Sequence, residues 1–228
     1  MNLSLLSLLG WTSAAGLLWT LRIVLFSNGL VFLEGVEWTD VGTYPFFAFL
    51  IWNLFLAWIP YVLSIWLARR KASWYSVGSL IGFAVWLLFL PNAPYLLTDL
   101  IHLHPRGNVP YWLDVCLLVT FAVAGWLLGL ASLRSVHLRF WSHLPNWQQL
   151  SLVTFVLGAS SYGVFVGRFL RLNSWDIFTQ PLATFWSVLH PLLHPFEFGQ
   201  ALLLVPILGG LLLLSYSSFL TAEKTSIQ

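Results

Sequence analysis

Charged side chains are scarce in this sequence. Only 8% of its 228 residues are Asp, Glu, Lys or Arg, whereas 59% are hydrophobic. Soluble domains carry about 25% charged residues, so a chain this poor in charge cannot cover a water-exposed surface with polar side chains. The composition therefore excludes an ordinary soluble domain and indicates a protein that is surrounded largely by lipid.

Cysteine is nearly absent, and several chemical signatures are missing altogether. The single cysteine, Cys116, excludes an intrachain disulfide and a cysteine-based zinc site. A net charge of +2, with no basic run beyond Arg69, Arg70 and Lys71, excludes nucleic acid as a partner. The sequence also has no HExxH motif, no phosphate-binding glycine loop and no Ser-His-Asp order that would mark a known reaction. It therefore names no cofactor.

Long apolar runs are the main feature that the sequence does have. A helix needs about 20 apolar residues to cross a bilayer, and six segments meet this requirement. They predict one all-α, multi-pass transmembrane domain over residues 1–228, with about six membrane-spanning helices. The first apolar run has no basic residue before it, so we interpret it as a span and not as a signal peptide. The expected spans are 3–26, 44–68, 74–97, 111–133, 148–170 and 198–220.

Proline interrupts this pattern in two places. Pro91 and Pro94 each remove a backbone donor, so we expect the third span to be distorted or to end near Asn92–Tyr95. Residues 173–197, between the fifth and sixth spans, are apolar but too rich in proline to cross the membrane. We expect an interfacial or re-entrant segment there, with a short helix near Leu182–Leu189.

The distribution of charge predicts an orientation. Lys and Arg favour cytoplasmic loops, and with six spans most of them share one side with both termini: Arg69, Arg70, Lys71, Arg134, Arg139 and Lys224. We therefore predict a cell (inner) membrane protein with both termini in the cytoplasm. Most acids fall on the opposite, outer side: Glu34, Glu37, Asp40, Asp99, Asp114, Asp176 and Glu197.

Two polar clusters lie at the predicted outer side. The first follows the third span, where Asp99 and His102 are three residues apart and share one helix face, and Asp114 enters the next span from the same side. The second ends the fifth span, where Arg168 and Arg171 also share a face. Ionisable groups in spans usually face the bundle interior and find partners.

We therefore expect the two clusters to meet. Arg168 or Arg171 would pair with Asp99, Asp114 or Asp176, and His102 would complete the network.

At these residues the sequence resembles the DUF1361 family of bacterial multi-pass membrane proteins, whose function is not established. The resemblance lies in Phe89–Tyr95 with Thr98, Asp99 and His102, and in Gly167–Arg171 with Asn173–Asp176. The similar layout extends from the second span onward. It implies a membrane domain and points to these positions, but it supplies no reaction.

Each candidate residue also has a structural interpretation. Arg168 and Arg171 could bind a phosphate or carboxylate, or form internal salt bridges. Asn92 and Tyr95 could line a pocket, or Asn92 could cap carbonyls that the prolines free.

A metal site is disfavoured. The rings of His102 and His104 would point apart on a helix, and Pro191 and Pro195 should break the helix that would align His190 with His194. We interpret Arg22 as reaching outward to the membrane interface.

Three functions remain open. The first is binding or processing of an anionic lipid or amphiphile at the outer interface. The second is a non-catalytic scaffold or assembly factor with a structural charge network, and the third is a small-solute or proton-linked transporter. For the first function, Asp99, His102 and Asp114 would supply acid–base chemistry. The substrate-binding residues would be Arg168, Arg171, Asn173, Asp176, Asn92 and Tyr95.

Overall fold

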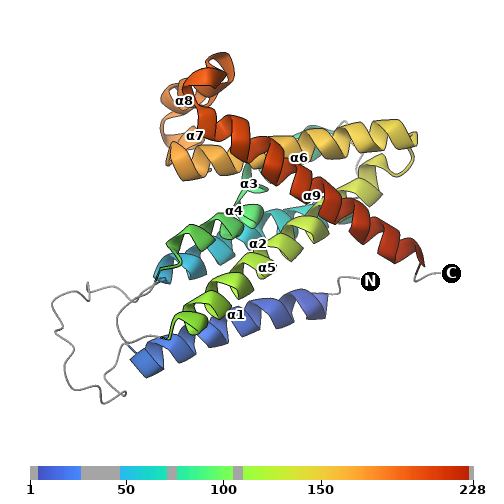
Figure 1. The fold of residues 1–228 in the computed structure, drawn as a ribbon. Coiled ribbons are helices and arrows are strands. Elements are labelled where there is room, and N and C mark those ends of the chain that lie inside the picture. The colour runs from blue at the N-terminus through green and yellow to red at the C-terminus, as the bar shows by residue number, and fades with distance from the viewer. Residues whose placement is uncertain (1–4, 27–46, 71–75, 105–109, 226–228) are drawn as a thin grey trace.

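A computed structural model describes residues 5–26, 47–70, 76–104 and 110–225. Lys71, Glu34, Glu37 and Asp40 lie outside these ranges. The described residues form helices and no strand (Figure 1). The α-helices are α1 (Leu5–Phe26), α2 (Ala48–Arg69), α3 (Val77–Phe89), α4 (Asn92–Thr98), α5 (Tyr111–Val136), α6 (Asn146–Phe169), α7 (Asp176–Thr179), α8 (Pro181–Leu193) and α9 (Gly199–Thr225). Short 3-10 turns η2 (Asp99–His102) and η4 (Pro195–Glu197) and a π-helical turn η3 (His137–Trp141) complete them.

The helices confirm an all-α, multi-pass membrane protein. Five described stretches are long and apolar enough to cross a bilayer: Ala48–Arg69, Val77–His102, Tyr111–Trp141, Asn146–Phe169 and Gly199–Thr221. The first predicted span corresponds to α1, whose 22 residues make a rod about 33 Å long at a rise of 1.5 Å per residue. Length and composition identify the other five spans. A total of six spans therefore requires that α1 also crosses the membrane.

The helices form two packed groups. In Figure 1, α1, α2, α4 and α5 run side by side, while α6 and α9 cross them as a second group. One set of buried side chains joins the first group, including Leu50, Leu96 and Phe121. The second set joins α3 and the end of α5 to α6 and α9, and it includes Trp86 and Tyr216. Because α5 contributes to both sets, it is the central element of the bundle.

The helix α4 is held between α5 and α6 by two pairs of glycines. Gly125 and Gly129 on α5, and Gly163 and Gly167 on α6, are each spaced four residues apart, the pattern that lets membrane helices approach closely. A Cβ atom on Gly125 would lie 2.6 Å from Cδ1 of Leu96 and closer still to the Ala93 carbonyl oxygen. One on Gly163 would lie 2.8 Å from Cβ of Pro91 and closer still to its Cγ. Larger residues at these positions would push α4 out of its place.

The third span breaks at the prolines, as predicted, although slightly earlier than expected. The helix α3 ends at Phe89 and α4 begins at Asn92. The Asn92 amide donates to the Phe89 carbonyl at 2.9 Å and to the Ser174 hydroxyl at 3.1 Å, while Ser174 donates to the Leu88 carbonyl at 3.3 Å. Asn92 therefore caps the break, and Ser174 ties the loop after α6 to it.

The segment between the fifth and sixth spans contains the expected short helix. The 13 residues of α8 make a rod about 20 Å long, which is too short to cross a hydrocarbon core of about 30 Å. The expectation that Pro191 breaks this helix is wrong, because α8 continues through it to Leu193. The rings of His190 and His194 consequently lie 4.7 Å apart, centroid to centroid.

Candidate functional site

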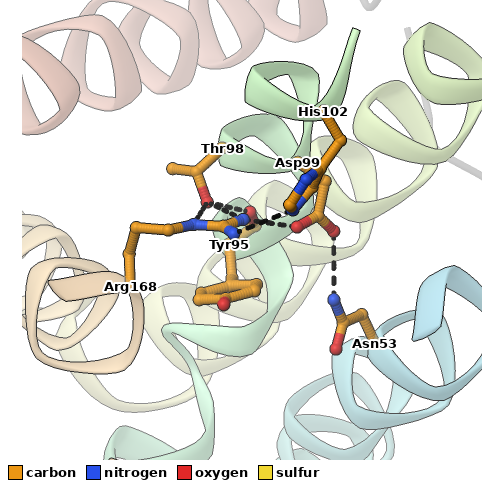
Figure 2. Close-up of polar contacts among 6 residues, drawn as sticks. All are labelled: Asn53, Tyr95, Thr98, Asp99, His102 and Arg168. Carbon is orange, nitrogen blue, oxygen red and sulfur yellow. Dashed lines mark hydrogen bonds and ion pairs between the residues drawn. The ribbon is translucent and has the colours of Figure 1, made fainter. Parts of the chain in front are cut away.

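A buried ion pair joins the two sequence clusters. Arg168, in the last turn of α6, donates through Nη2 to Oδ1 of Asp99, the first residue of η2 (Figure 2). The Asp99 side chain is 1% exposed and that of Arg168 is 15% exposed. Since ionised groups are costly to bury alone, each residue supplies the opposite charge that the other needs in the bundle.

The Arg168 guanidinium has further partners on the same segment. It donates to the Thr98 hydroxyl from Nε at 3.0 Å and from Nη2 at 2.8 Å, and it lies 4.5 Å from the centre of the Tyr95 ring. Asn53 on α2 donates to the second Asp99 oxygen at 3.0 Å. The pair therefore connects three helices, α2, α4 and α6, as Figure 2 shows.

His102 completes this cluster as a hydrogen-bond acceptor. Its Nε2 lies 3.4 Å from Nη1 of Arg168, and arginine can only donate. The Nε2 lone pair therefore faces the guanidinium in this arrangement. Its ring also packs edge-on against Phe49 of α2, with the centroids 5.1 Å apart.

Asp114 lies in a separate buried pair. It accepts from Nε of Arg22 at 2.5 Å, and the two side chains are 3% and 4% exposed. The guanidinium of Arg22 also lies 4.9 Å from the centre of the Phe47 ring. The interpretation of Arg22 as an interfacial residue is therefore wrong, because its partner is an acid on α5 that draws it into the bundle.

The remaining sequence candidates lie in the loop after α6. Arg171 is exposed and has a positive φ of 57°. The Asp176 carboxylate accepts from the backbone N–H of Asn173 at 2.6 Å and so closes a local turn. In the part of the chain that the structure describes, Arg171 has no acidic partner, and Asp176 stays on its own loop.

A cavity of about 790 Å³ lies beside the ion pair, between α2, α3, α4, α6 and α8. The described residues of its walls are mostly apolar and include no charged side chain. The polar groups that line it include Asn53, Asn92, Tyr95, Asn173 and Ser174. Asn53 and Tyr95 also contact Asp99 and Arg168, respectively, so the ion pair lies directly behind the cavity wall.

The cavity occupies only one half of the bundle. On α6 its lining extends inward from Gly167 to Ala159, and from Phe169 to Ala159 the helix rises about 15 Å at 1.5 Å per residue. This depth is about half of a hydrocarbon core of about 30 Å. We call the end of the bundle that holds this cavity and the Asp99–Arg168 pair the polar end.

A second polar network lies at the opposite end of the bundle and was not selected from the sequence. His137, 6% exposed, bonds through Nδ1 to the Tyr216 hydroxyl and through Nε2 to Oε1 of Gln149, both at 2.7 Å. Gln149 donates from Nε2 to the Leu144 carbonyl at 2.7 Å, so its Oε1 must accept. His137 therefore donates from Nε2 to Gln149. With its Nδ1 contact to the Tyr216 hydroxyl, it joins the end of α5 to α6 and α9.

This network explains why the fourth span is longer than predicted. The sequence predicts an end at Leu133, but the helix continues through η3 to Trp141.

Within the described residues, no three His, Cys, Asp or Glu side chains are placed to hold a metal ion.

Neither a curated protein nor a solved structure matches this chain. The model of one family, described as a protein of unknown function (DUF1361), matches residues 52–215. The matched region runs from α2 into α9 and includes both members of the Asp99–Arg168 pair and the walls of the cavity. The chain therefore belongs to the DUF1361 family.

Proposed function

We propose that this protein binds an anionic amphiphile within the membrane. The apolar portion of the ligand would occupy the cavity, and its head would lie at the polar end. The observation that carries the proposal is the cavity itself, which has apolar walls, a cluster of amide and hydroxyl groups and a buried ion pair behind it.

The cavity has the properties of a ligand site. Its volume of about 790 Å³ falls within the range of about 300–1,000 Å³ that is usual for small-molecule sites. Such sites combine apolar walls with a few polar groups that fix orientation. Leu56, Val85 and Phe185 supply apolar surface, while Asn92 and Asn173 supply amides.

Arg171 is the cation that we assign to the head. It directly precedes Leu172, Asn173 and Ser174, which line the cavity, and it is exposed. A guanidinium binds phosphate or carboxylate through two parallel hydrogen bonds. Arg168 has a different role in this proposal, because its donors already bind Thr98 and Asp99 and hold α4 against α6.

Acid–base chemistry on the head is a second step of the same proposal. Asn53 lines the cavity and binds Asp99, so one side chain separates that carboxylate from the ligand. Asp99 or His102 could act on the head only after the contact with Arg168 opens. Asp114 is held by Arg22, and we give it no part in this chemistry.

Photo-crosslinking tests the binding. The probe is oleoyl lysophosphatidic acid with a diazirine in its chain, added to the purified protein in phosphatidylcholine vesicles. We expect crosslinks on wall residues such as Val85 and Phe185. Ala159→Trp should fill part of the cavity and lower the affinity for the probe by about tenfold or more, which corresponds to about 1.4 kcal/mol of binding free energy. Phe155→Trp is the matched control, because Phe155 is 67% exposed on the same helix. Equal labelling of the two variants would contradict the proposal.

A series of lipids that differ only in the headgroup tests whether the site prefers a negatively charged head. Oleoyl lysophosphatidic acid, oleoyl lysophosphatidylcholine and mono-oleoylglycerol share one chain, and we expect the phosphate monoester to bind most tightly. Arg171→Gln should remove this preference, and Arg171→Lys should keep part of it. If Arg171→Gln leaves the order unchanged, the assignment of Arg171 to the head is wrong.

A further inference from the structure

We infer that the ligand enters the cavity sideways from the surrounding lipid, past a gate formed by α8, whose movement the hydroxyl of Tyr162 restrains. This inference rests on the proposed function and narrows its substrate class. The ligand is then a molecule dissolved in one leaflet of the bilayer and not a solute delivered from water.

The helix α8 forms one wall of the cavity. Pro181, Thr184, Phe185 and Val188 line the cavity from α8, opposite residues of α2, α3 and α6. Figure 1 shows α8 at the periphery of the bundle, beyond α6. Moving α8 away would therefore widen the opening of the cavity at the side of the protein.

The packing of α8 suits a movable wall. It packs mainly against its chain neighbours α7 and η4, and its contacts with α2, α3 and α6 are sparse. Non-helical residues border it at both ends, Gln180 at φ −139°, ψ 62° and His194 at φ −123°, ψ 57°. Hinges are commonly residues of this kind, at the ends of an element that otherwise moves as a rigid body.

The outer surface of α8 is suited to lipid. Leu182, Trp186 and Leu193 are 75%, 61% and 61% exposed, and α8 contains no Asp, Glu, Lys or Arg. A lid that faced water would carry polar side chains on this surface. The apolar surface places the opening against the acyl chains of the bilayer.

One hydrogen bond fastens the gate. The Tyr162 hydroxyl on α6 donates to the Val188 carbonyl on α8 at 2.5 Å. Among the described residues it is the only side-chain hydrogen bond that ties α8 to α2, α3 or α6. The tyrosine ring also lines the cavity, so this contact lies at the point where the ligand would pass.

Tyr162→Phe removes the hydroxyl and keeps the ring. A hydrogen bond contributes a net of about 0.5–1.5 kcal/mol. Its loss should make association of the vesicle-borne oleoyl lysophosphatidic acid probe about 2- to 10-fold faster, and dissociation should become faster as well. Tyr111→Phe, at the exposed start of α5, is the matched control and should leave both rates unchanged. Faster dissociation with unchanged association would show that Tyr162 is only a ligand contact, and this result would overturn the gate.

A reversible bridge tests the movement directly. Tyr162→Cys and Val188→Cys are introduced in a Cys116→Ser background, which has no other thiol, and joined with a bifunctional methanethiosulfonate. If the bridge is made before the probe is added, uptake should stop. If it is made afterwards, the bound probe should stay trapped, and reductant should restore exchange in both cases.

The outcomes separate the two proposals. Free exchange of the probe in the bridged protein would overturn the gate and leave binding in the cavity intact. Expulsion of bound probe on bridging would show damage to the cavity instead of closure, and would also count against the gate. Absence of probe binding in the unbridged, unsubstituted protein would overturn the proposed function itself.

Discussion

Two arginines carry charge into the bundle, and each meets one carboxylate there. Arg168 binds Asp99 and Arg22 binds Asp114, with all four side chains buried or nearly so. Breaking a buried pair by removing one partner costs far more than replacing both, because the remaining charge has no counter-ion. This asymmetry makes the structural contribution of each pair measurable.

For the Asp99–Arg168 pair we expect Arg168→Met to lower the free energy of unfolding by about 3–5 kcal/mol. The double variant Asp99→Leu with Arg168→Met should recover most of this loss. Unfolding in mixed micelles with increasing SDS provides the measurement, and Arg139→Met, on an exposed side chain, is the control. Equal stability of the single and double variants would mean that the pair is not coupled.

The reversed pair tests whether binding depends on the order of the two charges. In Asp99→Arg with Arg168→Asp the charges exchange places, so a purely structural pair would be kept. We expect this variant to lose crosslinking of the lysophosphatidic acid probe even where it folds, because Asn53, Thr98 and Tyr95 are arranged for the original order. Full crosslinking would show that binding does not depend on the order of the two charges.

The sequence placed Asp99 and Arg168 at the same end of the bundle, but it could not choose their partners. Spacing along one helix specifies a face, whereas a pairing depends on how helices pack across the bundle. By sequence alone, Asp114 is an equally good partner for Arg168. In the structure, however, Asp114 binds Arg22, which is 92 residues away from it in the chain. The sequence does not predict the His137 network, because nothing in the segment around His137 indicates that it contacts Tyr216 or Gln149.

Among the elements, α4 is the one whose position depends most on small residues. Glycines on α5 and α6 bring it close enough for Asn92 to cap the break and for Asp99 to reach Arg168. The break itself was predictable, since proline removes a backbone donor at a fixed position. The clamp was not, because only the packed structure shows which glycines face α4.

Two glycines on α6 test the clamp. Gly163→Ala would place a Cβ 2.8 Å from Cβ of Pro91 and closer still to its Cγ, and overpacking of this kind costs about 1–3 kcal/mol. Gly158→Ala meets nothing within 4 Å and should be neutral or stabilise the helix by up to about 1 kcal/mol. Thermal unfolding of both variants in detergent gives the comparison, and an equal shift in Tm would contradict the clamp.

At the scale of the molecule, the polar groups divide between its two ends. The cavity and the Asp99–Arg168 pair lie at one end, while the His137 network lies at the other. The spans were predictable because length and hydropathy suffice to locate them. The cavity was not, since its walls come from helices that are adjacent only in space.

The orientation of the whole chain stays a prediction. Figure 1 shows the start of α1 and the end of α9 on the same side of the bundle. The order of the spans puts the basic residues Arg69, Arg134 and Arg139, at the ends of α2 and α5, on that same side. By the positive-inside rule a green fluorescent protein fused after α9 should fluoresce. An alkaline phosphatase fused at the same point should be inactive. The reverse pattern would place the polar end in the cytoplasm.

The Arg22–Asp114 pair has a consequence for the timing of biogenesis. The two residues are separated by 92 positions, and synthesis at about 5–20 residues per second makes Asp114 about 5–20 s later than Arg22. During that interval Asp114 and the rest of α5 have not been made, so α1 cannot settle against α5 until the central helix has emerged. Docking of the first helix is therefore a late event, set by the pace of translation.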